Sequence, residues 1–189
     1  DVYEFIRVNK LNLRKILLTH SHHDHVNSID SLLERYDLPI YINKLEADFW
    51  KKSYDNLILT DSDDNFNLGK SLITSIHTPG HTPGSCCYSF DKNLIAGDTL
   101  FVFGCGRCDL HGGNPEKMYG SLKRLRKNLS SDTIIMPGHN YSVKRESTMH
   151  EEIDGNPFFS FNNMKDFVQY RMHTHDKIRE EPYGPITNL

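Results

Sequence analysis

Four histidines and one aspartate stand within six consecutive residues, from His20 to His25, and this cluster constrains the chain more than any other feature. It follows a short apolar run that predicts a buried strand, and it ends where a helix is predicted to begin. In an extended segment, side chains two residues apart face the same side, so His20 and His22 point together. Asp24 and His25 enter the first helical turn and point elsewhere. These groups can therefore serve two neighbouring metal ions, and zinc accepts imidazole and carboxylate ligands.

Apolar runs and helical patterns alternate along the chain, which indicates an α/β (α+β) fold. Strands are predicted over residues 15–19, 40–42, 72–76, 86–90, 93–96 and 133–136. Helices are predicted over residues 1–6, 26–38, 44–52 and 115–129, and a helical tail over 141–180 is interrupted at 155–157. Loops are predicted over 53–70, with at most a short strand, and over 102–114. We expect a metal-binding domain at 1–145 and a helical C-terminal appendage at 146–189.

Composition and charge exclude several classes of protein. The chain of 189 residues has a net charge of −3, which argues against a nucleic-acid-binding face. No apolar run approaches the roughly 18 residues of a membrane span. Its four cysteines include the adjacent pair Cys86 and Cys87, a poor disulfide pair, so we expect a reducing, cytoplasmic location. Cys105 and Cys108 have the spacing of half a zinc knuckle, but no second pair completes it.

Three later segments also carry potential ligands directly after predicted strands. They are a Pro-Gly-rich stretch around His81, a Gly-Asp-Thr stretch at Asp98 and a Pro-Gly-His stretch at His139. Sites in α/β folds form beyond the ends of strands, so these residues are expected to meet the first cluster. A single histidine after a strand is more often a surface residue, and a metal-free histidine-rich loop is the less favoured alternative. Taken together, the segments predict a site with five histidines and two aspartates.

These motifs resemble those of a known superfamily. The pattern His-X-His-X-Asp-His at residues 20–25, followed in order by His81, Asp98 and His139, resembles the metallo-β-lactamase superfamily over about residues 10–145. Within it, the stretches Thr-Pro-Gly-His-Thr-Pro-Gly-Ser, Gly-Asp-Thr-Leu-Phe and Gly-Cys-Gly-Arg resemble the glyoxalase II branch. The tail over residues 156–185 is similar to that of zinc-dependent hydrolases encoded beside bacterial polyketide synthases.

The resemblance implies an αββα sandwich with the metal site at one edge, between two sheets. It implies a first ion held by His20, His22 and His81, a second ion held by Asp24, His25 and His139, and Asp98 as the bridge between them. It also implies opening strands with an Asp-Pro-Gly turn, which this chain does not contain. We therefore expect the first sheet to lack its N-terminal strands, and residues to have been removed or omitted upstream of Asp1.

A pair of ions about 3.5–4 Å apart can bridge a water and lower its pKa to about 7, which gives a nucleophile at neutral pH. We expect one ion to polarise the substrate carbonyl, and Asp24 to orient the nucleophile as well as bind metal. A thiol leaves with a pKa of about 8.5 and needs no general acid, so a thioester is favoured over a lactam. Two zinc ions are expected, with iron or manganese as alternatives because these ligands are not selective.

Three residues are predicted to meet the substrate: Arg107, Asp109 and Tyr141. The resemblance to glyoxalase II implies a basic residue and a tyrosine that grip glutathione after the Gly-Cys-Gly turn. Arg107 keeps the basic position, whereas Asp109 stands where the tyrosine is expected and should disfavour a glutathione carboxylate. Acyl groups on a carrier protein or coenzyme A are therefore favoured over acyl-glutathione, in keeping with a role in polyketide biosynthesis. The basic segment 123–127 can meet an acidic carrier, although a solvated helix face is the simpler explanation.

Two other functions stay open at this point. The Gly-Cys-Gly-Arg-Cys-Asp stretch at residues 104–109 also resembles the persulfide dioxygenases, which would use one iron held by two histidines and Asp98. The second alternative is a metal-bearing binding module without turnover. One iron per chain with oxygen uptake would favour the first alternative, and a metal-loaded chain inactive on thioesters would favour the second.

Overall fold

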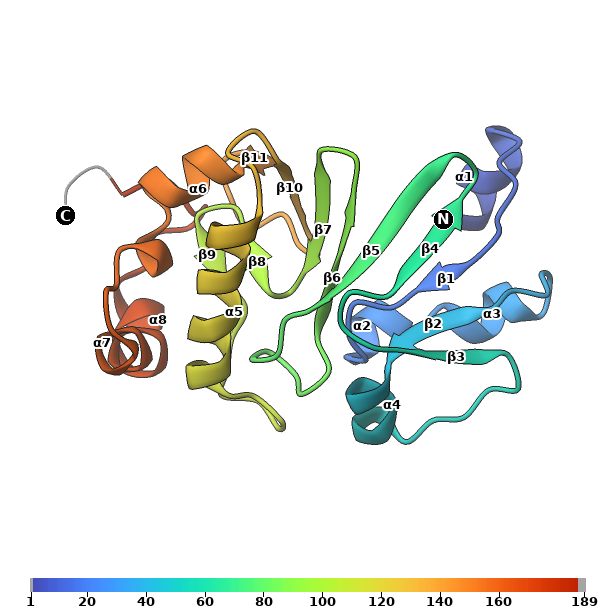
Figure 1. Ribbon diagram of the computed structural model, residues 1–189, viewed down its shortest axis with the longest axis horizontal. Helices are drawn as coiled ribbons and strands as arrows, with labels where there is room; N and C mark the ends of the chain where they lie inside the picture. The colour runs from blue at the N-terminus through green and yellow to red at the C-terminus, as the bar shows by residue number, and fades with distance from the viewer. Residues whose placement is uncertain (1, 187–189) are drawn as a thin grey trace.

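The computed structural model describes residues 2–186 (Figure 1). Its helices are α1 (Val2–Val8), α2 (His23–Val26), α3 (Ile29–Leu33), α4 (Lys44–Trp50), α5 (Pro115–Asn128), α6 (Met149–Gly155), α7 (Met164–Gln169) and α8 (His175–Ile178). A short 3-10 turn, η1 (Pro157–Phe159), and a π-helical turn, η2 (Tyr170–Thr174), lie among the last helices. None of the helices within residues 2–186 is both long and apolar enough to cross a bilayer.

The strands form two main sheets and a hairpin. They are β1 (Ile16–Leu17), β2 (Ile40–Asn43), β3 (Leu57–Thr60), β4 (Asn65–Leu68), β5 (Ser71–His77), β6 (Cys86–Phe90), β7 (Asn93–Gly97), β8 (Leu100–Phe101), β9 (Gly104–Cys105), β10 (Ile134–Pro137) and β11 (Ser147–Thr148). The first sheet is parallel, in the order β1-β2-β3, and the second has the order β11-β10-β7-β6-β5-β4. Strands β7 and β10 are parallel and are joined through α5, so their carboxyl ends lie at the same edge.

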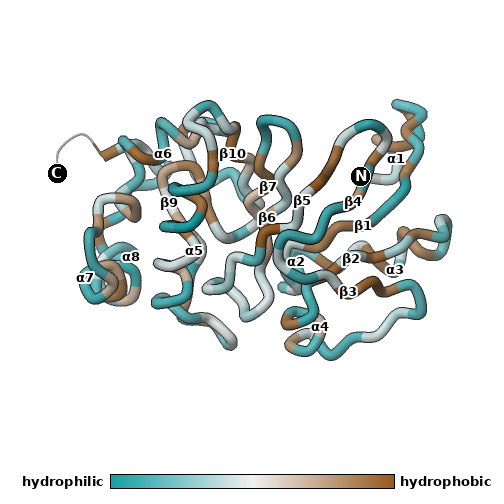
Figure 2. Tube along the Cα trace, in the orientation of Figure 1, coloured by the Kyte–Doolittle hydropathy of each residue, from teal (hydrophilic) through white to brown (hydrophobic). Residues whose placement is uncertain are grey.

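The two sheets pack against each other and carry helices on their outer faces (Figure 1). Between the sheets, the fully buried Tyr88 of β6 packs with Ile73 and Leu17, and its hydroxyl donates to the Leu18 carbonyl at 2.9 Å. Outside the first sheet, Ile29 of α3 and Trp50 of α4 pack against β2. The hydropathy of α5 alternates along the helix because one of its faces covers the second sheet (Figure 2). This αββα order confirms the predicted fold class.

Most predicted strands and helices are present, but several predictions are wrong in part. The helix predicted over 26–38 is instead the pair α2 and α3, interrupted at Asn27 and Ser28. The Ser28 hydroxyl donates to the Asn27 side chain at 3.0 Å, and such local bonds compete with a continuous helix. The predicted loop over 53–70 contains both β3 and β4, because the apolar run 57–60 pairs in parallel with β2. The loop over 102–114 also contains the short strand β9.

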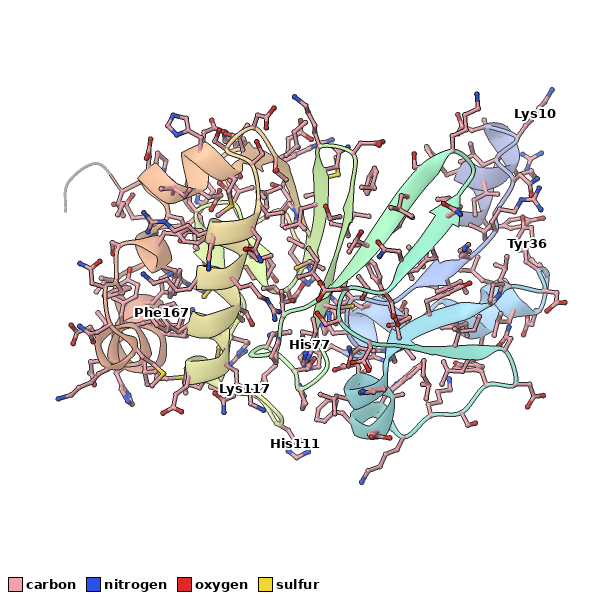
Figure 3. The ribbon with its side chains drawn as sticks, viewed as in Figure 1. Lys10, Tyr36, His77, His111, Lys117 and Phe167 are labelled. Atoms are coloured by element: carbon pink, nitrogen blue, oxygen red, sulfur yellow. The ribbon has the colours of Figure 1, made fainter. Side chains whose placement is uncertain are left out.

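The C-terminal segment returns to the second sheet rather than extending away from it. Only part of the predicted tail helix forms, because residues 141–146 are not helical and β11 pairs with β10 before α6 begins. A capping box of Thr148 and Glu151 starts α6. Phe158 and Phe167 then join the same apolar cluster as Leu122 of α5, and Figure 3 labels Phe167 where α7 lies beside α5.

Candidate metal centre

Loops at one edge of the two sheets bring together all seven residues predicted to bind metal. Each group of them follows a strand or begins a helix, as the sequence predicted: His20 and His22 after β1, Asp24 and His25 in α2, His81 after β5, Asp98 after β7 and His139 after β10. Gly97 lies opposite Pro137 in the parallel pair, so Asp98 and His139 emerge side by side. Three overlapping groups of three ligand-type residues result, each with its ligand atoms within 4.8 Å of one another.

The first group contains His20, His22 and His81. The Nε2 atom of His81 lies 2.8 Å from Nδ1 of His22, and the rings of His20 and His81 meet edge to face with centroids 4.8 Å apart. The His81 Nδ1 atom lies 2.8 Å from the Arg107 carbonyl oxygen. Because a carbonyl oxygen can only accept, Nδ1 carries the proton and donates this hydrogen bond. That bond fixes the tautomer that leaves the Nε2 lone pair of His81 free for an ion.

The second group contains Asp24, His25 and His139. The Nε2 atoms of the two histidines lie 3.2 Å apart, and Asp24 Oδ2 lies 3.3 Å from His139 Nε2. Asp98 lies between the two groups: its Oδ1 atom is 3.4 Å from His25 Nε2, and its Oδ2 atom is 3.6 Å from His81 Nε2. The Asp98 carboxylate is therefore close to histidines of both groups.

The donor atoms of these residues fit a cation. His20 Nε2 and Asp98 Oδ1 are buried and have no hydrogen-bond partner within residues 2–186. A buried acceptor without a partner costs about 1–3 kcal/mol, and two such atoms facing one cluster of imidazoles are well placed to bind a cation. Neutral imidazole and carboxylate are the donor set that zinc, iron and manganese accept.

Burial keeps the imidazoles of the cluster neutral, which is the form that binds metal. Desolvation lowers the pKa of His20, His22 and His25, and it lowers the pKa of His81 to about 4. These four imidazoles are therefore neutral at pH 7, with lone pairs available. Burial raises the pKa of Asp98 to about 6 in the metal-free chain.

Without metal, the chain is expected to lose stability as the pH falls from about 6.5 to about 4. In that range the unfolded chain protonates its histidines, whereas folded His81 stays neutral, so the unfolded state binds more protons. Asp98 opposes this loss of stability between pH 3.8 and about 6, because its raised pKa lets the folded chain bind a proton that the unfolded chain does not. Its effect is that of one group, whereas four imidazoles act in the other direction. Urea unfolding in excess chelator at about pH 7.5, 6 and 5 measures the effect. A free energy of unfolding that is constant or larger at the lower pH would contradict it.

Two glycines let the backbone approach Asp98 closely. A Cβ atom on Gly138 would lie 2.4 Å from Asp98 Oδ1, and one on Gly106 would lie 1.8 Å from the Asp98 carbonyl oxygen. Neither contact is possible, so the glycines of the Pro-Gly-His and Gly-Cys-Gly stretches have a direct steric role beside the predicted ligand.

A cleft of about 370 Å³ adjoins the cluster. It is lined by aromatic, basic and acidic side chains together with two of the predicted ligands: His81, Asp98, Phe101, Cys105, Arg107, Tyr141, Arg171, Asp176, Arg179, Glu181 and Tyr183. Of the three predicted substrate contacts, Arg107 and Tyr141 line this cleft, and Tyr141 stacks on His139 with ring centroids 5.1 Å apart. Asp109 is not among the lining residues, but it accepts two hydrogen bonds from Arg107, at 2.9 and 2.6 Å.

Several residues of the cleft could not be predicted from the sequence. Arg171 and Asp176 are five residues apart and pair because the chain makes a π-helical turn between them, which no composition signal indicates. Glu46 was also missed. Its position three residues after the N-cap Asn43 is typical of a helix start, but its carboxylate turns toward the loops of the site instead.

Two further histidines and the four cysteines have structural contacts instead. His77 ends β5 and its Nε2 contacts the Pro83 carbonyl oxygen at 3.0 Å, and His111 is stacked on Phe49 at the tip of the loop before α5 (Figure 3). The four cysteines are buried free thiols. Neither Cys105 nor Cys108 belongs to any of the three ligand groups found among residues 2–186.

Known proteins resemble this chain in sequence and in fold. A family model described as the metallo-beta-lactamase superfamily matches residues 3–139. The probable polyketide biosynthesis zinc-dependent hydrolase PksB of Bacillus subtilis (strain 168) is 32% identical over 165 residues, 87% of this chain and 73% of that protein. A hydroxyacylglutathione hydrolase of Bartonella henselae is 42% identical over 132 residues, 69% of this chain and 50% of that protein. Among solved structures, ETHE1 from Myxococcus xanthus matches with a TM-score of 0.81 and 26% identity, over 91% of this chain and 74% of that one.

Proposed function

Because this chain belongs to the metallo-β-lactamase superfamily, as its motifs predicted, and has relatives named as hydrolases, we propose that it hydrolyses acyl thioesters with two divalent metal ions. The observation that carries the proposal is the convergence of seven ligand-type side chains around two buried atoms without a hydrogen-bond partner in the described part of the chain. Both atoms belong to predicted ligands, His20 and Asp98.

We assign each ion its ligands from the groups described above. One ion would be held by His20, His22 and His81, the other by Asp24, His25 and His139, with Asp98 between them. When bound, such ions supply an activated water and a Lewis acid for the thioester carbonyl. Zinc is the ion we propose first, because the relative PksB is named a zinc-dependent hydrolase, with iron or manganese as alternatives.

Asp24 is the residue proposed to orient the attacking water. It is the one exposed member of the seven, and only its Oδ2 atom is drawn toward His139 Nε2, at 3.3 Å. Its second oxygen is therefore available to accept a hydrogen bond from a water at the metal site. The thiol of a thioester leaves with a pKa of about 8.5, so the chain needs no proton donor for the leaving group.

The charges of the cleft favour a substrate whose thioester is attached to an uncharged group. Each of its three arginines is already paired with a carboxylate of this chain. The pairs are Arg107–Asp109 at 2.6 Å, Arg171–Asp176 at 2.7 Å and Arg179–Glu181 at 2.8 Å. A glutathione carboxylate would have to displace one of these pairs, whereas the pantetheine arm of a carrier protein or coenzyme A is uncharged near its thioester. We therefore propose pantetheine thioesters as substrates, consistent with the name of the relative PksB.

A neutral N-acetylcysteamine thioester is expected to be hydrolysed with higher kcat/KM than the same acyl group on glutathione. Asp109→Asn should raise the ratio of glutathione to N-acetylcysteamine activity about fivefold, because it frees Arg107 from an exposed ion pair worth up to ~1 kcal/mol. Thiol release measured on both substrates gives the ratio. A wild-type enzyme that prefers acyl-glutathione, or a ratio unaffected by the substitution, would contradict the assignment.

The hydrolase proposal itself is tested with acyl-glutathione, acyl-coenzyme A and acyl-carrier thioesters, with thiol release followed before and after chelation. Hydrolysis that stops on chelation and returns with zinc supports the proposal, and hydrolysis that survives chelation refutes it. A metal-loaded chain that releases no thiol from any of the three would instead favour the binding module without turnover.

One observation favours the alternative of a mononuclear iron dioxygenase. His20, His25 and Asp98 form a group of two histidines and one carboxylate, which is the ligand set of many non-haem iron oxygenases. The Gly-Cys-Gly-Arg-Cys-Asp stretch that resembles persulfide dioxygenases lies beside it, since Gly106 packs against the Asp98 backbone. Metal analysis separates the two functions: two ions per chain favour the hydrolase, and one iron with oxygen uptake on a persulfide favours the dioxygenase.

A further inference from the structure

We propose that Glu46 is a positioning residue of the metal centre: its buried carboxylate holds together the two loops that present the first ion's three histidines. This role rests on the proposed metal-dependent function, and it concerns how the site is assembled rather than which substrate it takes. Glu46 lies in the first turn of α4 and is fully buried, yet none of the predicted ligands comes from α4.

The two oxygens of Glu46 divide their bonds between the two loops. Oε1 accepts from the Ser21 backbone N–H at 2.7 Å and from the Ser21 hydroxyl at 2.6 Å. Oε2 accepts from the Thr82 hydroxyl at 2.6 Å and from the Gly84 backbone N–H at 3.0 Å. Ser21 lies between His20 and His22 in the chain, and Thr82 directly follows His81. One carboxylate thus fixes the neighbours of all three histidines.

The backbone leaves little freedom at this junction. A Cβ atom on Gly84 would lie 2.1 Å from the Glu46 backbone nitrogen, so the loop after β5 packs directly on the start of α4. Asn43, which ends β2, caps α4 by accepting from the Leu45 N–H at 3.0 Å. Because β2 pairs in parallel with β1, α4 begins beside the loop that follows β1. The sheet register therefore delivers Glu46 to both loops.

The Glu46 carboxylate is buried without a cationic partner among the described residues. No lysine, arginine or histidine of residues 2–186 lies within 4 Å of its carboxylate, and its four donors are two hydroxyls and two backbone N–H groups. A buried carboxylate kept without a cationic partner costs stability. Its negative charge, close to the His22 and His81 loops, is compensated when a cation binds there. Outer contacts of this kind typically contribute about 10- to 100-fold to metal affinity.

The chain contains a matched control in Glu152 of α6. Glu152 is also fully buried and accepts from the Phe103 N–H at 3.1 Å, the Ser147 hydroxyl at 2.6 Å and the Asn156 amide at 2.7 Å. None of these donors neighbours a predicted ligand in the chain. Glu46 and Glu152 are therefore both buried and hydrogen-bonded, but only Glu46 bonds to residues next to predicted ligands.

The test compares Glu46→Gln with Glu152→Gln on the full chain, using zinc content after dialysis and Co²⁺ titration followed by absorption. Glutamine cannot accept all four bonds, because its NH₂ group faces donors. We expect Glu46→Gln to lower the affinity of the chain for one of the two ions by about 10- to 100-fold and to leave its affinity for the other near the wild-type value. Glu152→Gln should lower the unfolding temperature without changing either affinity. Equal effects of the two variants on metal affinity would overturn the proposal.

Two milder variants keep the test decisive if Glu46→Gln does not fold. Ser21→Ala removes one donor to Oε1, and Thr82→Val removes one donor to Oε2. Each is expected to lower, several-fold, the affinity for the ion that Glu46→Gln affects. Normal binding of both ions in both variants would overturn the role of Glu46. A wild-type chain that takes up no divalent ion would refute the metal centre and this role with it. A chain that binds two ions but cleaves no thioester would refute only the proposed substrate.

Discussion

Replacing Asp98 with alanine is expected to lower kcat/KM for a thioester by about 10³-fold and to reduce the metal content of the purified chain. Asp98 is almost fully buried, and its two oxygens lie 3.4 to 3.6 Å from the Nε2 atoms of His25, His81 and His139. Its removal deletes the one negative charge shared by both ligand groups. Loss of Lewis-acid stabilisation of several kcal/mol corresponds to about three powers of ten in rate.

The matched control is Asp132→Asn, which changes a carboxylate that pairs with Lys92 on the surface. It should leave both hydrolysis and metal content at wild-type levels. Far-UV circular dichroism of the Asp98→Ala protein would exclude unfolding as the cause of the loss. An Asp98→Ala protein that retains two ions and more than about a tenth of the wild-type rate would rule out the shared role assigned to Asp98.

Replacing Phe167 with alanine is expected to lower the free energy of unfolding by about 3–5 kcal/mol, the usual cost of deleting a buried aromatic ring. Phe167 of α7 is fully buried. Its ring contacts Tyr119 of α5 at 5.4 Å between centroids and Phe158 at 5.7 Å. The ring therefore ties the C-terminal segment to the helix that covers the second sheet.

Urea unfolding of the two proteins measures the loss, and Phe5→Ala is the matched control. Phe5 of α1 is 63% exposed, so its truncation should change stability by less than about 0.5 kcal/mol. The division of the chain at residue 145 stays a prediction, and this experiment bears on it. A single, destabilised transition is expected, since both sides share one core; two separate transitions, with only the second affected, would indicate an independent appendage.

The sequence predicts which ligand-type residues gather better than it predicts the elements that carry them. The six-residue cluster at His20–His25 has a spacing that few functions other than metal binding explain. Each later predicted ligand follows an apolar strand. A strand end is easy to predict, because the apolar run stops and glycine or proline begins. The structure brings all seven residues together, although their ion-binding roles stay a prediction.

Other parts of the fold depend on contacts that a single sequence does not reveal. Strand β3 lies in a polar region, and it forms because its four residues pair with β2, 17 positions earlier in the chain. Asn27 and Ser28 end a helix whose apolar periodicity continues past them. Glu46 has the position of an ordinary helix-capping residue, and only the tertiary structure turns its carboxylate toward Ser21 and Thr82.

The predicted ligands come from both halves of the molecule, so an ion held as proposed would affect folding. His20, His22, Asp24 and His25 follow the first sheet, whereas His81, Asp98 and His139 follow strands of the second. An ion bound by both sets acts as a cross-link between the two sheets, and it binds the native chain in preference to the unfolded one. Metal uptake and folding would then be thermodynamically linked, and a higher concentration of the ion would raise the folded fraction of the chain.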